Sequence, residues 1–266
     1  INPDGTASYN SIDASLWYIH AVYKYVQYTK DVKTLEKLYP YLVQIIDAYI
    51  NGTAYSIKQD WDHLLATGPE GAQLTWMDAK TDHVITPRWG KPVEINALWF
   101  NALSMMAEFE EQLKGTKNYI DLAVQVKESF LQTFWSEKNH YLYDLIQGEQ
   151  KDATLHPNQL LAISLPFKLL SDRQEKSIVE IVERELLTPH GLRTLPVGDP
   201  NYHGNYQGAQ VNRDEAYHQG TVWAWLMGPF ITSYVKVNKR SKLAVKNALS
   251  FLKGFEQHLC EAGLSS

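Results

Sequence analysis

The segment QLTWMDAKTDHVITPRWGKPVEINALWF, residues 73–100, places a carboxylic acid, Asp78, directly after Trp76 and Met77. The residues around Asp78 do not show a helical pattern. Burial against aromatic rings disfavours the charged form of a carboxyl group and raises its pKa. Such a group can hold its proton near neutral pH and donate it as a general acid. Asp78 is therefore a candidate acid, and the alternative is an aspartate that only stabilises a turn or caps a helix.

A second group of reactive side chains lies in NRDEAYHQGTVWAW, residues 212–225. Hydrolysis of a glycosidic bond uses two carboxyl groups, one of which protonates the leaving oxygen. Asp214 and Glu215 are candidates for the base that activates water. Because a helix is predicted to follow this segment, the alternative is that both acids only stabilise the N-terminus of that helix through its dipole.

Flat aromatic rings beside polar side chains suit sugar recognition, because a pyranose has an apolar C–H face and a rim of hydroxyl groups. Aromatic residues make up 12% of the chain. Those in or beside the long loops include Trp61, Trp76, Trp89, Tyr202, Tyr206, Tyr217 and Trp223. Asp13 and Trp17, four residues apart, would share one helix face. Glu94 falls in the first turn of another predicted helix, where the helix dipole alone would favour it. In HPNQLLAISLP, Asn158 and Gln159 either cap a helix or face a ligand.

Apolar residues at spacings of three and four predict about eight helices, joined as hairpins by short connections. Ser11 is the expected N-cap of the first helix. The predicted helices cover residues 12–30, 32–50, 93–114, 117–134, 157–163, 172–186, 218–237 and 241–260. Two long loops, 54–92 and 187–217, separate them, with short strands expected in AYSI and HLLAT. Loops of this length inside a compact domain are usually functional, so the site is expected there.

Composition and charge argue against several classes of function. The formal charge of −5 and the lack of a basic stripe disfavour a nucleic-acid or anionic-membrane partner. No apolar run approaches the roughly 18–20 residues that span a bilayer, which predicts a soluble chain. A single cysteine, Cys260, excludes an internal disulfide framework and favours a reducing compartment, so we expect a cytoplasmic protein. The nine histidines show no metal-ligand spacing, and no phosphate-binding glycine loop occurs, so neither metal nor cofactor is expected. The start at Ile1 suggests a processed chain or an excised domain.

Six phrases, in order along the chain, resemble one known family. They are YNSIDASLWY (9–18), TWMDAK (75–80), TPRWGKPVEINALWFNAL (86–103), HPNQLLAISLP (156–166), GLRTLPVGDPNYHGNYQG (191–208) and RDEAYHQGTVWAWLMGPF (213–230). Together they resemble the C-terminal amylo-α-1,6-glucosidase domain of glycogen debranching enzymes in its bacterial and archaeal form. The resemblance runs from about residue 9 to residue 235.

This resemblance implies an all-α fold, an (α/α)6 toroid with its active site at the loop-rich mouth. It also implies an inverting hydrolase that removes the α-1,6-linked glucose left at a trimmed branch point of glycogen, limit dextrin or a branched maltosaccharide. The aspartate of TWMD is the family's general acid, and this role carries over to Asp78. The base carries over less directly, because Val222 stands where eukaryotic relatives have a glutamate two residues after HQG. Asp214 is the first choice for the base, and Glu215 is the second.

The implied site also has a set of substrate contacts. These are Asp13, Trp17, Trp76, Arg88, Glu94, Asn158, Gln159, Tyr217, His218, Gln219 and Trp223. Residues 1–266 are expected to form a single toroid domain that is incomplete at its N-terminus, because a full toroid has more helices than this chain shows. Such a fragment could be inactive. The alternatives are a glucoamylase-like or trehalase-like glycosidase on the same toroid, or a non-catalytic glucan-binding fragment.

Overall fold

The computed structural model of the chain describes residue 5 and residues 10–262, and helices account for 55% of this described part. The chain divides into two compact units, each described by itself below. Unit 1 comprises the residues up to Asp78, Pro87–Thr133 and Leu145–Gln150. Unit 2 comprises Ala79–Thr86, Phe134–Asp144 and the residues from Lys151 onward. The expectation of a single domain over 1–266 concerns how these units combine, and it stays a prediction.

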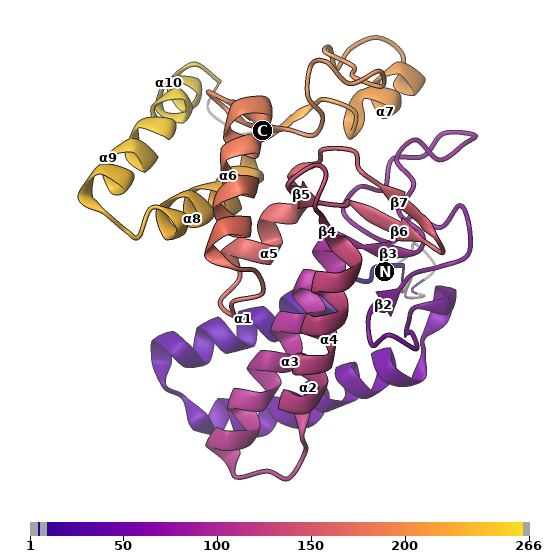
Figure 1. The fold of residues 1–266 in the computed structure, drawn as a ribbon, viewed down its shortest axis with the longest axis vertical. Helices are drawn as coiled ribbons and strands as arrows, with labels where there is room; N and C mark the ends of the chain where they lie inside the picture. The colour runs from indigo at the N-terminus through magenta and orange to yellow at the C-terminus, as the bar shows by residue number, and fades with distance from the viewer. Residues whose placement is uncertain (1–4, 6–9, 263–266) are drawn as a thin grey trace. The chain divides into compact units, whose positions relative to one another are not determined.

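Unit 1 is built on four helices, which Figure 1 labels α1 to α4. Their bounds are Ala14–Thr29 (α1), Val32–Asn51 (α2), Val93–Leu113 (α3) and Tyr119–Phe134 (α4). The last residue of α4, Phe134, is assigned to unit 2. The four predicted helices are confirmed to within two residues at each end. Ser11 accepts a hydrogen bond from the Ala14 amide at 3.1 Å, as a capping serine does, although the N-cap position itself falls on Asp13.

The core of unit 1 lies between α1, α2 and α3, and α1 packs most extensively against α3. Every third or fourth residue of α1 faces this core, and Leu16 and Ile19 are fully buried there. Tyr49 of α2 packs edge-on against Trp99 of α3, with ring centroids 6.0 Å apart. Its hydroxyl donates to the Ile12 carbonyl at 2.6 Å, which ties α2 to the start of α1.

Short strands join the helices of unit 1. β1 (Lys58–Gln59) pairs antiparallel with β2 (Leu65–Ala66), and β3 (Lys91–Pro92) pairs antiparallel with β6 (Leu145–Gln147). The expectation of a strand in HLLAT is confirmed. The expectation of a strand in AYSI is wrong, since residues 54–56 form a 3-10 turn, η1, in which Tyr55 has φ of 60°. A left-handed residue at that point prevents the extended pairing that the residue types favour.

Unit 2 combines helices with two small sheets. The strands β4 (Trp135–Ser136) and β5 (Tyr141–Leu142) form a hairpin, and β8 (Leu187–Thr188), β9 (Gly191–Arg193) and β10 (Val222–Trp223) form a three-stranded antiparallel sheet. A further strand, β7 (Gln150–Asp152), lies at the unit boundary. The helical elements are η2 (Pro157–Leu160), α5 (Leu161–Ser164), α6 (Asp172–Leu186), α7 (Gln210–Tyr217), η3 (Ala224–Leu226), α8 (Met227–Val237), α9 (Lys242–Phe251) and α10 (Lys253–Ala262). α8 packs against α5, α6 and α9 and forms the centre of this unit.

One predicted helix of unit 2 begins in the wrong place. The pattern predicts a helix over 218–237, but α8 begins at Met227. Residues 222–223 are instead a strand, with Val222 paired to Arg193 and Trp223 paired to Leu192. In addition, residues 210–217 form α7 inside a segment expected to be a loop. Long-range strand pairing outweighs the local helical pattern here.

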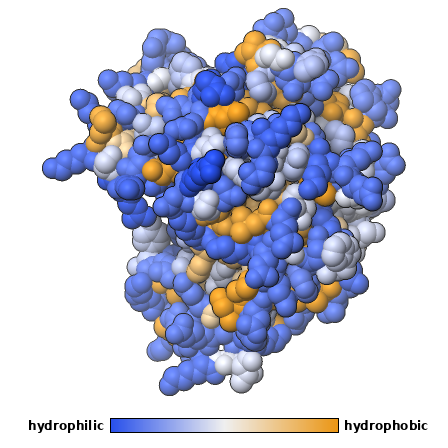
Figure 2. All heavy atoms as spheres, viewed as in Figure 1, coloured by the Kyte–Doolittle hydropathy of each residue, from blue (hydrophilic) through white to orange (hydrophobic). Residues whose placement is uncertain are grey.

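The face of the molecule drawn in Figure 2 is mostly hydrophilic. On the face drawn in Figure 2, apolar residues appear as small groups among polar ones. Over the described part of the chain, no helix combines the length and the apolar character needed to cross a bilayer.

Candidate functional site

Asp78 ends a loop of unit 1, residues 68–78, that has no regular secondary structure. Met77 turns its side chain into the core and is fully buried, while Asp78, the next residue, is exposed. The loop is attached to the helical core because the Ile12 amide donates to the Leu74 carbonyl at 2.9 Å. This bond holds the start of α1 against the loop. The loop that carries Asp78 is therefore anchored to the helical core.

The same attachment brings Asp13 into electrostatic range of Asp78. Although the Asp78 side chain reaches solvent, the atoms around its carboxyl partly desolvate it and raise its pKa. A backbone hydrogen bond opposes this rise, and the negative charge of Asp13 adds to it. Asp13 accepts a hydrogen bond from the Ser11 hydroxyl at 2.6 Å. A carboxyl that resists ionisation can serve as a proton donor. Unit 1 thus places two of the predicted site residues together, in an arrangement that suits an acid.

Arg88 and Glu94, both predicted substrate contacts, form an ion pair inside unit 1. Their side chains are 0% and 1% exposed, and Nη2 of Arg88 donates to Oε2 of Glu94. Glu94 lies in the first turn of α3, as predicted. Two charges buried this deeply require each other, since either one alone would lie desolvated in the core. The pair positions the chain before α3, and Thr67 reinforces it by donating to the Arg88 carbonyl at 3.0 Å.

Two further predicted contacts of unit 1 carry rings. Trp17 and Trp76 are both half-buried, the first on α1 and the second in the Asp78 loop. The Trp17 ring meets His20 edge-on, at 5.6 Å between centroids. Partial burial of His20, together with the charge of Lys24, lowers the pKa of this imidazole. A neutral ring at this position adds no charge to the surroundings of Trp17.

Asp214 and Glu215 occupy the second half of α7, the fifth and sixth of its eight residues. The alternative that they only stabilise a helix N-terminus is therefore wrong, because α7 has no acidic residue in its first turn. Toward the C-terminal end of a helix the dipole disfavours negative charge. Both side chains are half-buried. Their position needs another reason, and a pocket of unit 2 offers one.

This pocket encloses about 340 Å³ within unit 2. Its lining is His83, Val84, Ile85, Asn201, His203, Glu215 and Gln219. The lining contains one carboxylate, from Glu215, and polar groups that can donate or accept hydrogen bonds. Adjacent residues on a helix point in different directions, so Asp214 does not share this lining. The lining therefore favours Glu215 over Asp214 as the acid that faces a ligand in unit 2.

Gln219 fixes the wall of this pocket. Its side-chain amide donates to Oγ1 of Thr86 at 2.8 Å and to the Ile85 carbonyl at 3.3 Å. Its backbone carbonyl accepts from the His203 amide at 2.6 Å. Gln219 thus joins three segments that are far apart in the sequence. It lines the pocket, and its amide group also holds neighbouring segments together, while its predicted contact with substrate stays a prediction.

The predicted aromatic contacts of unit 2 form one cluster. The rings of His218 and Trp223 stack, with centroids 5.4 Å apart and an interplanar angle of 14°. Tyr217 meets both of them edge-on, at 4.7 Å and 4.9 Å. Nε1 of Trp223 donates to the Tyr217 carbonyl at 3.1 Å. His218 is fully buried, whereas Tyr217 and Trp223 remain partly accessible, so only these two rings can meet a sugar.

Asn158 and Gln159 are buried in η2 rather than displayed to solvent. Nδ2 of Asn158 donates to the Asp144 carboxylate at 2.9 Å. The Gln159 side chain accepts from the Leu142 amide at 3.2 Å and donates to the His156 carbonyl at 3.2 Å. Both ends of the Gln159 amide are therefore engaged with backbone. The structure gives Gln159 an internal role.

Several lining residues were not predicted, namely His83, Asn201 and His203. Each lies in a long polar loop beside a recognised motif: His83 follows TWMDAK, and the other two lie in DPNYHGNYQG. The signal available was a histidine or an amide inside a loop already expected to be functional. What the sequence did not reveal was that both loops reach one pocket. Elsewhere, the described residues contain no group of three or more His, Cys, Asp or Glu placed to hold a metal ion.

A family model described as amylo-alpha-1,6-glucosidase matches the chain over residues 1–266. The chain belongs to the amylo-alpha-1,6-glucosidase family. The expected family membership is therefore confirmed, and the chain is a glycoside hydrolase-type domain.

Relatives of this amylo-alpha-1,6-glucosidase family member agree with the assignment. The chain is 26% identical over 247 residues to the glycogen debranching enzyme of Saccharomyces cerevisiae. This alignment covers 74% of the chain but only 16% of the yeast protein, so the chain spans a small part of that relative.

A solved structure supports the fold. The GH63 mannosylglycerate hydrolase from Thermus thermophilus superposes with a TM-score of 0.50 at 13% identity, over 65% of this chain and 38% of that one. At this identity the likeness concerns the fold alone. A helix-rich chain with this neighbour fits an α/α toroid, while the (α/α)6 arrangement stays a prediction.

Proposed function

We propose that this domain hydrolyses the α-1,6-linked glucose at branch points of glycogen or its limit dextrin, with inversion at the anomeric carbon. Family membership supports the reaction class, and the aligned yeast relative is a glycogen debranching enzyme. The observation that carries the catalytic part of the proposal is the environment of Asp78, where partial burial and the charge of Asp13 raise the pKa of the carboxyl. We further propose that residues 1–266 act as part of one glucosidase domain on a cytoplasmic glucan, without a cofactor.

In this proposal Asp78 protonates the glycosidic oxygen as the bond to the leaving sugar breaks. A carboxylate of α7 takes a proton from the water that attacks the opposite face of the ring. At the end of the cycle Asp78 has lost its proton and the α7 carboxylate has gained one, and proton exchange with solvent restores both. An inverting enzyme needs about 6.5–9.5 Å between its carboxyl groups to admit the water. A crystal structure with a bound inhibitor would test this separation directly.

The identity of the base rests on two different arguments. The family resemblance favours Asp214, whereas the pocket lining favours Glu215. The remaining candidates for sugar contact divide by accessibility. Asp13, Trp17, Trp76, Tyr217 and Trp223 are accessible enough to meet a substrate. Arg88, Glu94, Asn158, Gln159 and His218 are buried and would act by holding the accessible residues in place. Gln219 is also buried but lines the pocket, where it would meet a ligand.

The test is glucose release from branched limit dextrin, with trehalose and linear maltosaccharides as comparison substrates. We expect release from the branched substrate alone. Activity on trehalose or on linear chains would instead identify a trehalase-like or glucoamylase-like enzyme. Binding of maltosaccharide without release of glucose from any substrate would identify a glucan-binding domain. Because the chain covers only part of its yeast relative, any longer protein that contains it should be assayed beside it.

A further inference from the structure

Trp61 stands at the tip of the β1–β2 hairpin of unit 1 and is 85% exposed. A tryptophan gains more from burial than any other side chain, so a ring left this open forgoes a large stabilisation. Single exposed apolar residues are common and by themselves carry little weight. Trp61 differs from such residues in the charged groups that surround it.

The hairpin tip that carries Trp61 is held rigidly. Asp60 accepts a hydrogen bond from the Trp61 amide at 2.8 Å, and the Asp60 amide donates to the Leu64 carbonyl at 2.8 Å. His63, in the left-handed region with φ of 66°, donates its amide to the Asp60 carbonyl at 3.0 Å. Nε1 of Trp99 in the core donates to the His63 carbonyl at 3.1 Å. The backbone of the tip is therefore tied to α3, and Trp61 is presented from a fixed loop.

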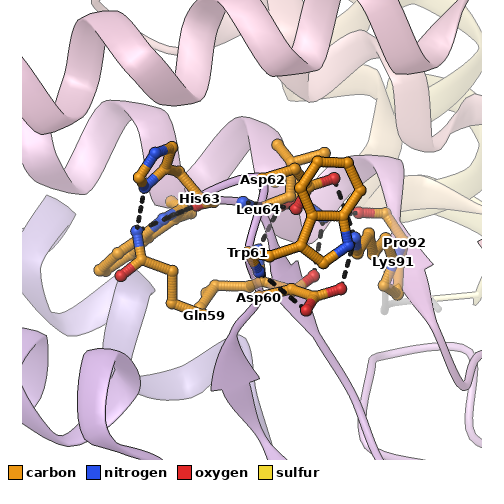
Figure 3. Close-up of polar contacts among 11 residues, drawn as sticks. Gln59, Asp60, Trp61, Asp62, His63, Leu64, Lys91 and Pro92 are labelled. Carbon is orange, nitrogen blue, oxygen red and sulfur yellow. Dashed lines mark hydrogen bonds and ion pairs between the residues drawn. The ribbon is translucent and has the colours of Figure 1, made fainter.

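Lys91 of β3 completes the arrangement (Figure 3). Its ammonium contacts the carboxylates of Asp60 and Asp62, at 2.7 Å and 2.9 Å, and lies 5.7 Å from the centroid of the Trp61 ring. Partial burial pushes the pKa of Asp60 upward, but the bonds from Lys91 and from the Trp61 amide outweigh this and hold the pKa below its ordinary value. Asp60, Trp61, Asp62 and Lys91 together are called the Trp61 platform below.

The chemistry of the Trp61 platform identifies its ligand class. Two carboxylates and one ammonium leave it with a net negative charge, which repels phosphates and other anions. An ammonium has three N–H donors, and the two aspartates engage two of them, while each carboxylate retains acceptor capacity for hydroxyl groups. An open aromatic face with charged hydrogen-bonding groups at its edge suits a neutral polyhydroxyl ring. Because Lys91 lies over one side of the indole, the other side is available for stacking.

We propose that the Trp61 platform is a glucan-binding subsite, in which a glucose unit of the polymer stacks on Trp61 and its hydroxyls bond to Asp60 and Lys91. The proposal rests on the function proposed above for its choice of polymer. Its role is to hold a branched chain against the domain through contacts that take no part in bond cleavage. The carboxylates of the platform contact the Lys91 ammonium and can accept hydrogen bonds from hydroxyl groups, so they differ in role from Asp78.

The test is binding to glycogen by native gel electrophoresis, and to maltoheptaose by calorimetry. All variants carry Asp78→Asn, so that hydrolysis does not alter the polymer and the binding result does not depend on activity. Trp61→Ala should bind roughly fivefold to tenfold more weakly, the loss expected from one stacking contact. Trp61→Phe, which keeps a smaller ring, should bind with intermediate affinity. Thermal unfolding of each variant confirms that the fold is retained.

Tyr28 provides a matched control in the same unit, because it is 86% exposed on α1 and, among the described residues, belongs to no comparable cluster. Tyr28→Ala should bind as the parent does. The proposal is overturned if Trp61→Ala keeps the parent affinity, if Tyr28→Ala weakens binding equally, or if the parent shows no retardation in glycogen gels. Hydrolysis is measured separately, on the chain with Asp78 intact. If that chain releases no glucose while binding still depends on Trp61, the result counts against the proposed reaction and not against the platform.

Discussion

The Asp78 loop and helix α7 give their carboxyl groups different surroundings. In the loop, Asp78 has partial burial and a neighbouring carboxylate, Asp13, and both raise the pKa of Asp78. On α7, Glu215 faces a pocket whose lining includes His83, His203 and Gln219. The first environment disfavours negative charge, and the second surrounds a carboxylate with hydrogen-bonding groups. A two-carboxylate mechanism needs this asymmetry, because one group must keep its proton while the other must accept one.

Removing the proposed acid should have the largest effect on activity. Asp78→Asn keeps the size of the side chain but cannot donate the proton, so glucose release should fall by about 10²–10⁴-fold. Glucose release from limit dextrin measures the loss. Glu70→Gln, at an exposed position of the same loop, is the matched control and should keep full activity. A variant of Asp78 with near-normal turnover would remove this residue from the mechanism.

Variants of the two neighbouring acids of α7 test which of them is the base. Asp214→Ala and Glu215→Ala should differ, and the one that removes the base should lose about 10²–10⁴-fold in turnover. The pocket lining leads us to expect the larger loss from Glu215→Ala. Parallel measurements of maltosaccharide affinity separate lost catalysis from lost binding. Equal and small effects of both variants would place the base outside α7.

The buried ion pair tests whether unit 1 depends on its internal charges. Glu94→Gln removes the negative charge of the buried ion pair with Arg88, so the free energy of unfolding should fall by about 3 kcal/mol. Urea denaturation measures it. Asp47→Asn removes one partner of an exposed ion pair with Lys117 and should cost less than about 1 kcal/mol. Comparable losses for both variants would show that burial of the Arg88–Glu94 pair has little influence.

The smallest expected effect concerns the charge beside the acid. Asp13→Asn removes the negative charge that raises the pKa of Asp78, so that pKa falls. Asp78 then loses its proton at lower pH, and the alkaline limb of the kcat/KM profile moves to lower pH. The acidic limb should stay in place, since it reports the base. Glu70→Gln should leave both limbs unchanged, and a shift of the acidic limb in Asp13→Asn would contradict this explanation.

Much of the helical framework could be predicted, because α1, α2 and α6 bury apolar residues at helical spacings. α7 could not be, since its sequence QVNRDEAY has one buried residue and no apolar stripe. Likewise, Val222 and Trp223 read as the start of a helix until their pairing with β9 is known. Asp78 stood out through its aromatic neighbours. The contribution of Asp13 did not, since it depends on the contact between Ile12 and Leu74.

The glycine that follows Gln219 limits how this region can vary. Gly220 has φ of 128°, and a Cβ placed there would lie 2.7 Å from the His203 carbonyl oxygen and from the Tyr202 ring. Both obstacles belong to the segment that contributes Asn201 and His203 to the pocket lining, and the His203 amide is bonded to the Gln219 carbonyl. Any larger residue must push that segment away or break the bond. Among random variants that keep the fold, substitutions within His218–Gly220 should therefore be rare, and those of Gly220 should be the rarest.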